Sequence, residues 1–397
     1  MTRARRFVFW LLASSLGLLV AGCSSPASRR APQPGRTTLG SPLVILPAQM
    51  IGNHLVIEVK WDRSGPYRFL IDTGASTTLV TPALARHYAG PETFPLAPRV
   101  RVTGADGKIT ELPRGSLRRL ELGEARFEDV DVLIYDCAAL SAHLGVRIDG
   151  VLGFPLFREL LLTLDYPGSR VLLQSSRELP LLPGTTVPFD DARKIPLISV
   201  RIGERSLVAL IDSGSDAALS LNAVGLEPRF AFGPTVGATV GTLAGERTQQ
   251  IGRLAETLTV GEQVFPQPVV DLTDELSAIG GGLLRHFSVS FDQRRDRVTF
   301  FRDARGPLAT PARRSAGVSF TKTPAYWRIA GVVPKSSAEA EGIQPGDLVT
   351  RINGEPVAKW DFRRYEQLVA TAPEIALTFL AGPAETEKRV RVFELVP

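Results

Sequence analysis

Two short motifs combine an aspartate, a hydroxyl-bearing residue and a glycine, and each follows a run of apolar residues. The first is Asp72-Thr73-Gly74, after Phe69-Leu70-Ile71, and the second is Asp212-Ser213-Gly214, after Ala209-Leu210-Ile211. A carboxylate at the end of a buried strand is costly to ionise without a partner. If the two motifs meet, their carboxyls can share one proton, so that one acts as a general base and the other as a general acid.

One copy of such a motif is weak evidence, because an aspartate before a glycine often caps a turn. Two copies in equivalent places favour a catalytic pair over two independent turns. Gly74 and Gly214 would let the loops approach each other at the backbone, which a side chain would prevent. The sequence therefore predicts that Asp72 and Asp212 face each other across one cleft.

The elements around the two motifs repeat along the chain in the same order. Each aspartate ends a hairpin of alternating, β-type strands, and two more matched segments follow. The matched pairs are 55–60 with 198–203, 67–76 with 206–215, 122–127 with 260–265, and 151–171 with 278–298. A repeat of this kind predicts a duplicated lobe. We expect mostly β structure, with one lobe over 42–180, a second over 181–302, a linker over 303–316 and a small domain over 317–397.

The motifs resemble those of the aspartic peptidases of the pepsin and retropepsin clan. The resemblance rests on Ile71–Ser76 and Ile211–Ser215, each followed by an apolar-apolar-glycine element ending at Gly153 or Gly280. It implies two acid-protease-like β-barrel lobes and hydrolysis of polypeptide substrates by Asp72 and Asp212, without metal or organic cofactor. In the clan, the hydroxyl after each catalytic aspartate locks the two loops together. That role falls here on Thr73 and Ser213, with Gly74 and Gly214 supporting the loops.

Two features depart from the clan's pattern. The second motif has Asp216 where the first has Ser76, and this extra carboxylate could perturb the pair or bind substrate backbone. A candidate flap has no tyrosine and is glycine-rich, as in the retropepsins; it consists of Gly104, Ala105, Asp106 and Gly107. The same four residues would also suit an ordinary hairpin turn.

The C-terminal region resembles a PDZ domain, a small α+β module. Its signature is Gln344-Pro345-Gly346-Asp347 followed by Ile352-Asn353-Gly354. The resemblance implies that an extended peptide ligand adds to an exposed strand edge while backbone amides hold its carboxylate. We expect the carboxylate loop at Tyr326, Trp327, Arg328 and Ile329, with Tyr326 in place of the usual glycine. The alternative is a structural module that docks on the lobes.

The first residues have the order of a secretory signal. Arg3, Arg5 and Arg6 precede the uncharged apolar run 7–20, which is shorter than a membrane span, and then Ala21-Gly22-Cys23. This ending resembles the bacterial lipoprotein box, which implies a signal peptide over 1–22, lipidation of Cys23 and a tether over 23–41. We expect a cell-envelope protein anchored to a membrane and facing the periplasm, with Ser24 favouring the outer membrane. An ordinary signal peptide with an incidental cysteine is the alternative.

Charge and the remaining reactive residues exclude other chemistries. Six arginines precede the first acidic residue, and removing them from 46 basic residues leaves 40 against 41 acidic, so we expect no nucleic-acid partner. Cys137 has no second cysteine besides the lipidated one and is expected to be a buried structural thiol. The four histidines are scattered and predicted to lie on the surface; they are His54, His87, His143 and His286. Their spacing does not indicate a zinc site.

The leading prediction is therefore a lipid-anchored aspartic endopeptidase whose PDZ domain recruits or regulates. A rival from another class is a non-catalytic bilobal scaffold that presents the PDZ domain. Retention of both aspartates and both following hydroxyls argues against it, since a scaffold needs neither. A third reading is a homodimer in which Asp72 pairs with its symmetry mate.

Overall fold

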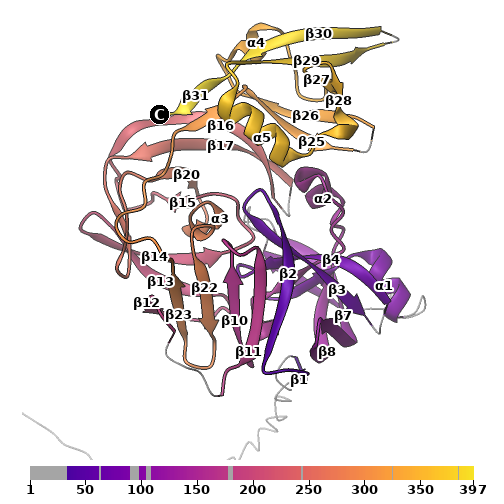
Figure 1. Ribbon diagram of the computed structural model, residues 1–397, viewed down its shortest axis with the longest axis vertical. Helices are drawn as coiled ribbons and strands as arrows, with labels where there is room; N and C mark the ends of the chain where they lie inside the picture. The colour runs from indigo at the N-terminus through magenta and orange to yellow at the C-terminus, as the bar shows by residue number, and fades with distance from the viewer. Residues whose placement is uncertain are drawn as a thin grey trace, which may run out of the picture. The chain divides into compact units, whose positions relative to one another are not determined.

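The computed structural model describes residues 34–61, 64–89, 98–103, 109–177, 182–242, 245–323, 325–382 and 384–397. Strands dominate these ranges, and Figure 1 shows only short helices between them. The fold is mostly β, as the alternating apolar pattern predicts. Most of the buried apolar side chains form one continuous core under the two lobes, and a separate core fills the C-terminal domain.

The first lobe is built around strands β3 and β4. Its elements are β1 (Arg36–Leu39), β2 (Leu43–Ile51), β3 (His54–Trp61), β4 (Ser64–Asp72), β5 (Thr78–Val80), α1 (Pro82–Ala89), β6 (Arg99–Thr103), β7 (Ile109–Leu122), β8 (Ala125–Ile134), α2 (Ala138–Leu144), β9 (Gly150–Gly153) and the 3-10 turn η1 (Phe154–Phe157). Strand β4 pairs in parallel with β9, which places Asp72 beside Gly153. Strand β5 runs antiparallel to β9 and parallel to β8. Phe69 and Ile71 are buried, and burying such a side chain stabilises the fold by about 1.5–3 kcal/mol. Their burial therefore fixes the orientation of β4 and the position of Asp72 at its end.

The second lobe repeats these pairings. Its elements are β13 (Leu197–Ile202), β14 (Arg205–Asp212), β15 (Leu219–Asn222), β16 (Phe230–Thr242), β17 (Gly245–Leu254), β18 (Leu258–Val260), β19 (Gln263–Phe265), β20 (Val269–Thr273), β21 (Ala278–Gly280) and α3 (Gly281–Leu284). Strand β14 pairs in parallel with β21, which places Asp212 beside Gly280. Strand β15 runs antiparallel to β21 and parallel to β20. Both aspartates thus end equivalent strands, while the duplication itself stays a prediction from the matched sequence blocks.

A sheet made from both lobes joins them. It runs in the order β12 (Thr185–Pro188), β23 (Arg297–Phe301), β22 (Ser288–Asp292), β10 (Leu160–Asp165), β11 (Arg170–Ser175) and β2. Within this sheet the halves meet at the antiparallel pair β10 and β22, with Leu162 opposite Phe291. Figure 1 shows β10, β11, β22 and β23 side by side. The lobes are therefore tied together by backbone hydrogen bonds and by a shared apolar face.

The C-terminal domain has a six-stranded sheet, a two-stranded sheet made of its first and last strands, and two helices. Its elements are β24 (Arg313–Ser315), β25 (Val318–Lys322), β26 (Trp327–Val332), α4 (Ser337–Ala340), β27 (Leu348–Ile352), β28 (Glu355–Pro356), the 3-10 turn η2 (Val357–Lys359), α5 (Phe362–Thr371), β29 (Glu374–Ala381), β30 (Ala384–Arg391) and β31 (Phe393–Val396). Asp361 caps α5 by accepting a hydrogen bond from the Arg364 amide at 2.7 Å. Within the six-stranded sheet, β26 lies between β25 and β27. The edges are β25 and β30.

Two predicted boundaries are wrong at their C-terminal ends. The expected tether over 23–41 includes β1, whose Arg36 pairs with Glu128 of β8. The expected linker over 303–316 includes β24, whose Ser315 pairs with Phe393 of β31. In both cases a short strand with few apolar residues gains its stability from the partner strand, which the local sequence does not reveal. Residues 1–22 and Cys23 lie outside the described ranges. Within those ranges, no helix is long and apolar enough to cross a membrane.

Candidate active site

The structure brings the two aspartate loops together. The Asp72 Oδ1 atom accepts hydrogen bonds from the backbone amides of Gly74, at 2.8 Å, and Ala75, at 3.1 Å. The Asp212 Oδ1 atom accepts one from the amide of Gly214, at 2.9 Å. The two carboxyls also share a side-chain hydrogen bond. Each carboxyl is therefore oriented by its own loop and directed at the other.

The glycines of the two motifs are required by this close approach. A Cβ atom built on Gly74 would lie 2.7 Å from Oδ1 of Asp212, and one built on Gly214 would lie 2.4 Å from Cγ of Asp72. Real Cβ atoms do not come this close to other heavy atoms, so any side chain at either position would push the opposite carboxyl away. The predicted close backbone approach of the loops has this physical basis.

Thr73 and Ser213 link the loops through four hydrogen bonds. The Thr73 hydroxyl donates to the Ile211 carbonyl at 2.6 Å and accepts from the Ser213 amide at 3.0 Å. The Ser213 hydroxyl donates to the Ile71 carbonyl at 2.9 Å and accepts from the Thr73 amide at 2.9 Å. Both side chains are fully buried. Because every donor and acceptor has a partner in the opposite loop, the bonds fix the separation of the loops.

Electrostatics hold at least one proton on the pair. Burial, followed by the charge of Asp212, raises the pKa of Asp72 well above its usual value, although the Gly74 and Ala75 amides oppose the shift. Burial also raises the pKa of Asp212, and the Gly214 amide, the hydrogen bond from Asp72 and the charge of His54 oppose it. Two close carboxylates with raised pKa values cannot both ionise easily. The arrangement can therefore supply a base and an acid at the same pH.

Asp216 lies in the second loop and interacts with residues outside the Asp72–Asp212 pair. Its backbone carbonyl accepts a hydrogen bond from the Asn53 side chain at 2.8 Å. Burial first, and then the charge of Asp216, raises the pKa of Asp271, which Arg247 and Gln249 oppose by hydrogen bonding to its Oδ2 atom. The carboxylate of Asp216 therefore interacts with the buried pair of Asp271 and Arg247 in the same lobe.

Sequence reasoning missed two residues near the pair. His54 was predicted on the surface but is only 8% exposed, and its Nε2 atom lies 3.2 Å from the Gly214 carbonyl oxygen. Tyr166 is buried, and after burial the charges of Asp212 and Asp72 raise the pKa of its hydroxyl. His54 begins β3 and lies 160 positions from Gly214, and Tyr166 lies in the turn after β10, so local sequence gives no signal for either.

The remaining predicted site residues have separate outcomes. The candidate flap, Gly104, Ala105, Asp106 and Gly107, lies outside the described residues. In the C-terminal domain, Trp327 and Ile329 are fully buried in the core, while Tyr326 is half-buried and Arg328 is exposed. For Trp327 and Arg328 the assignment to peptide binding is wrong, because β26 pairs there with both β25 and β27 and cannot accept another strand. The unpaired edge available next to it belongs to β25.

The C-terminal domain packs on the second lobe. A small apolar cluster joins Ile251 and Val269 of that lobe to Val333, Leu395 and Val396. Arg253 of β17 donates to the carbonyl oxygens of Thr310 and Pro311, at 3.0 and 3.2 Å, and also to that of Pro397. The docking alternative for this domain therefore has direct support from buried contacts.

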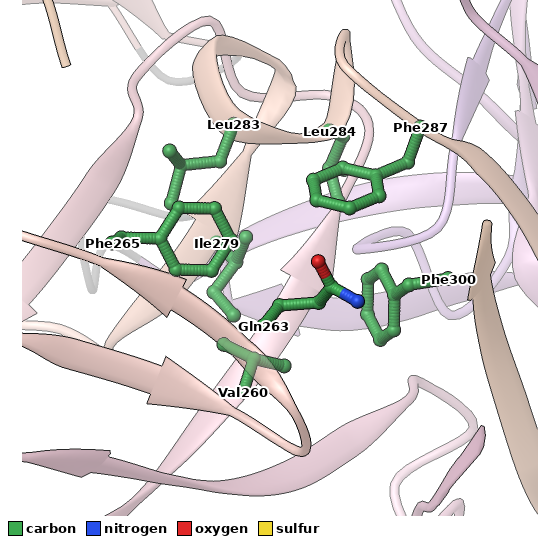
Figure 2. A pocket seen from close by; sticks show the side chains of 8 residues that line it. All are labelled: Val260, Gln263, Phe265, Ile279, Leu283, Leu284, Phe287 and Phe300. Atoms are coloured by element: carbon green, nitrogen blue, oxygen red, sulfur yellow. The ribbon is translucent and has the colours of Figure 1, made fainter. Parts of the chain in front are cut away.

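Other potential sites offer no chemistry. Cys137 is a free, fully buried thiol, and burial raises its pKa to about 12, as expected for a structural cysteine. Figure 2 shows an apolar pocket in the core of the second lobe, in which Gln263 is the one polar side chain. Its volume of about 10 Å³ is too small for a substrate. Across the described ranges, no three His, Cys, Asp or Glu side chains gather to hold a metal ion.

Comparisons with known proteins give two family matches and one similar solved structure. Residues 57–156 match the sequence model of a family described as aspartyl protease, and residues 328–380 match a PDZ domain model. No match was found among curated proteins. A solved structure, a retropepsin-like aspartic protease from Rickettsia conorii, aligns with 35% of this chain and 92% of its own, at 18% identity and a TM-score of 0.25. The chain thus contains an aspartyl-protease-like region in the first lobe and a PDZ region in the C-terminal domain.

Proposed function

We propose that this chain is an aspartic endopeptidase in which Asp72 and Asp212 share one proton and activate water against a peptide bond. The observation that carries the proposal is the meeting of two buried carboxyls, with raised pKa values, on loops that four hydrogen bonds lock together. A structural turn would need neither the shared hydrogen bond nor the locked spacing.

In the proposed reaction, the ionised carboxylate takes a proton from a bound water as the water oxygen bonds to the peptide carbonyl carbon. The protonated carboxyl gives its proton to the carbonyl oxygen, which forms a neutral gem-diol. The proton taken from water then passes to the amide nitrogen as the C–N bond breaks. The carboxylate that acted as the acid takes back a proton from a gem-diol hydroxyl, which leaves a carboxyl and an amine product and restores the pair. Shared protonation of two aspartates is the established mode of catalysis in aspartic proteases.

The rival readings make different demands on the same pair. The homodimer reading needs a second chain to supply the partner of Asp72, whereas here Asp212 of the same chain occupies that position. The non-catalytic scaffold keeps the fold but gives the shared proton no role. A scaffold would bind a peptide and its transition-state mimic equally well, which an enzyme does not.

For the PDZ region, we propose that a peptide ligand adds to the edge of β25, next to α5. The aromatic rings of Phe320 in β25 and Tyr365 in α5 pack 5.2 Å apart, so this edge and this helix form one side of the domain. Gly145, in the turn after α2 of the first lobe, lies against the last residue of β25 and the first residue of α5. A Cβ atom on Gly145 would be 3.1 Å from both Lys322 and Phe362. Peptide recruitment and docking on the lobes therefore involve neighbouring surfaces.

Membrane attachment and location are proposals based on the first residues. The charged start, the apolar run 7–20 and the Ala21-Gly22-Cys23 ending support lipidation of Cys23 and a place in the cell envelope, facing the periplasm. Ser24 supports the outer membrane. In that position the lobes would act on polypeptides of the envelope.

The test compares two ligands of one sequence. A peptide with a hydroxyethylene group at one bond mimics the gem-diol, and the matched all-amide peptide does not. Affinities are measured by isothermal titration. The Asp212→Asn chain is titrated with both ligands in a short incubation, so that the amide peptide is not consumed. Wild type and an Asp303→Asn control are titrated with the mimic alone. We expect tight binding of the mimic to wild type and to the control, whose exposed Asp303 is remote in sequence from both loops, and loss of at least 100-fold in affinity in Asp212→Asn. Equal affinity in all three chains would favour the scaffold.

A further inference from the structure

The tip of the hairpin between β2 and β3 reaches from the first lobe to the second active-site loop. His54 places its Nε2 atom 3.2 Å from the Gly214 carbonyl oxygen and its Nδ1 atom 3.2 Å from the Ile51 carbonyl oxygen. The neighbouring Asn53 side chain donates to the Asp216 carbonyl at 2.8 Å. A Cβ atom on Gly281 would come within 2.3 Å of the Asn53 carbonyl oxygen, so the tip is packed tightly. The hairpin tip therefore holds the loop that carries Asp212.

Both nitrogens of the His54 ring face oxygens that can only accept hydrogen bonds. A neutral imidazole has one N–H group and can satisfy one of them, whereas the imidazolium has two and satisfies both. His54 is only 8% exposed, so water offers little replacement for a missing hydrogen-bond partner. This site thus favours a cation next to Asp212.

The charged groups around the ring come from three elements. The second active-site loop contributes Asp212. The first loop contributes Asp72, which is hydrogen-bonded to Asp212. Arg285, next to helix α3, donates to the Asn53 side chain at 3.3 Å and is the other nearby cation. Of the two aspartates, Asp212 is the one whose pKa the charge of His54 lowers.

At the position that matches His54 in the second lobe, the described residues offer the first loop an apolar side chain and no cation. In the matched sequence blocks, the position of His54 corresponds to Leu197, and the preceding Pro196 accepts a hydrogen bond from the Ile211 amide through its carbonyl. An apolar residue cannot stabilise a carboxylate by charge. The two lobes are therefore alike in backbone but not in electrostatics.

We propose that His54 is a positioning residue that breaks the symmetry of the pair: as an imidazolium it holds the Gly214 carbonyl and makes Asp212 the ionised carboxylate. Asp72 is then the protonated partner. Its amide contacts with Gly74 and Ala75 orient the carboxyl that donates to the scissile carbonyl oxygen. The catalytic meaning of this assignment rests on the proposed function, but the electrostatic effect on Asp212 does not.

The test uses His54→Gln, because glutamine keeps an N–H donor for the Gly214 carbonyl but removes the charge. The matched control is His87→Gln, which changes an exposed histidine of helix α1. The carboxyl carbons of the pair are followed by ¹³C NMR in the full chain, and Asp212→Asn identifies their signals. We expect the lower of the two apparent pKa values of the pair to rise by about half a unit or more in His54→Gln and to stay unchanged in the control.

Two further measurements complete the test. The acid limb of the kcat profile should move to higher pH by the same amount in His54→Gln, while KM stays near that of wild type. In wild type, ¹⁵N NMR should show both His54 ring nitrogens protonated at the pH where the pair titrates, and this measurement needs no variant. An unshifted carboxyl titration in folded His54→Gln, or a neutral ring in wild type, would overturn the proposal. Since these NMR results do not depend on turnover, an inactive wild type would count against the proposed function alone.

Discussion

Replacing Thr73 by valine removes one hydroxyl from the lock between the loops and leaves the side chain almost the same shape. Two hydrogen bonds disappear, and the Ile211 carbonyl and Ser213 amide lose their partner in a fully buried place. Each such orphaned group costs about 1–3 kcal/mol, so the loss in stability of the loops should be about 2–6 kcal/mol. The aspartates would also lose their fixed separation.

Hydrogen exchange of the Ser213 amide measures this loss directly. At about 1.4 kcal/mol for each factor of ten, the lower bound corresponds to about 30-fold faster exchange through local opening. Thr186→Val is the matched control, because Thr186 is an exposed threonine whose hydroxyl bonds only that of Thr299, at 2.9 Å. There we expect little change in the exchange of Ser213. Unchanged Ser213 exchange in Thr73→Val, together with full activity, would refute the assignment of these bonds as the lock.

Three other outcomes are expected. In Arg247→Met, the buried Asp271 carboxylate keeps the hydrogen bond from Gln249 but loses that from Arg247, and the free energy of unfolding at neutral pH should fall by about 3–5 kcal/mol. Because the pKa of Asp271 is raised in the folded state, this loss should shrink as the pH falls and the carboxyl is protonated. Denaturation at two pH values checks both results. Cys23→Ala should leave the protein unlipidated and released from membranes, and a mutant still wholly membrane-bound in fractionation would contradict the lipoprotein prediction. Deleting residues 309–397 should spare cleavage of a short unstructured peptide while changing the choice among folded substrates; complete loss with folded lobes would show that the C-terminal domain takes part in the chemistry.

What the sequence could predict was local and repeated. Asp72 and Asp212 were identifiable because each follows an apolar strand and precedes a hydroxyl residue and a glycine, and these patterns depend on neighbours along the chain. The two copies then indicated that the strands end at equivalent places, which the parallel pairings with β9 and β21 bear out. The order of the elements followed from the same blocks.

What the sequence could not predict depends on contacts between distant segments. His54 reaches a carbonyl 160 positions away, and β1 is a strand only because β8 lies beside it. In the PDZ region, Trp327 was assigned to the ligand site although an apolar residue of that size is equally suited to the core, where the structure places it. Distinguishing an edge strand from an interior strand requires the sheet order, which alternation along one strand does not contain.

The most direct test of the central claim is the turnover of wild type, Asp72→Asn, Asp212→Asn and the double mutant on one peptide, with circular dichroism to confirm the fold and Asp303→Asn as control. If the carboxyls act as a unit, each single mutant should lose nearly all turnover and the double mutant should be no worse than either. Wild type should show a bell-shaped pH dependence whose two limbs belong to the pair. Full activity in Asp212→Asn would contradict the intramolecular pair, and full activity in both single mutants would exclude aspartic catalysis.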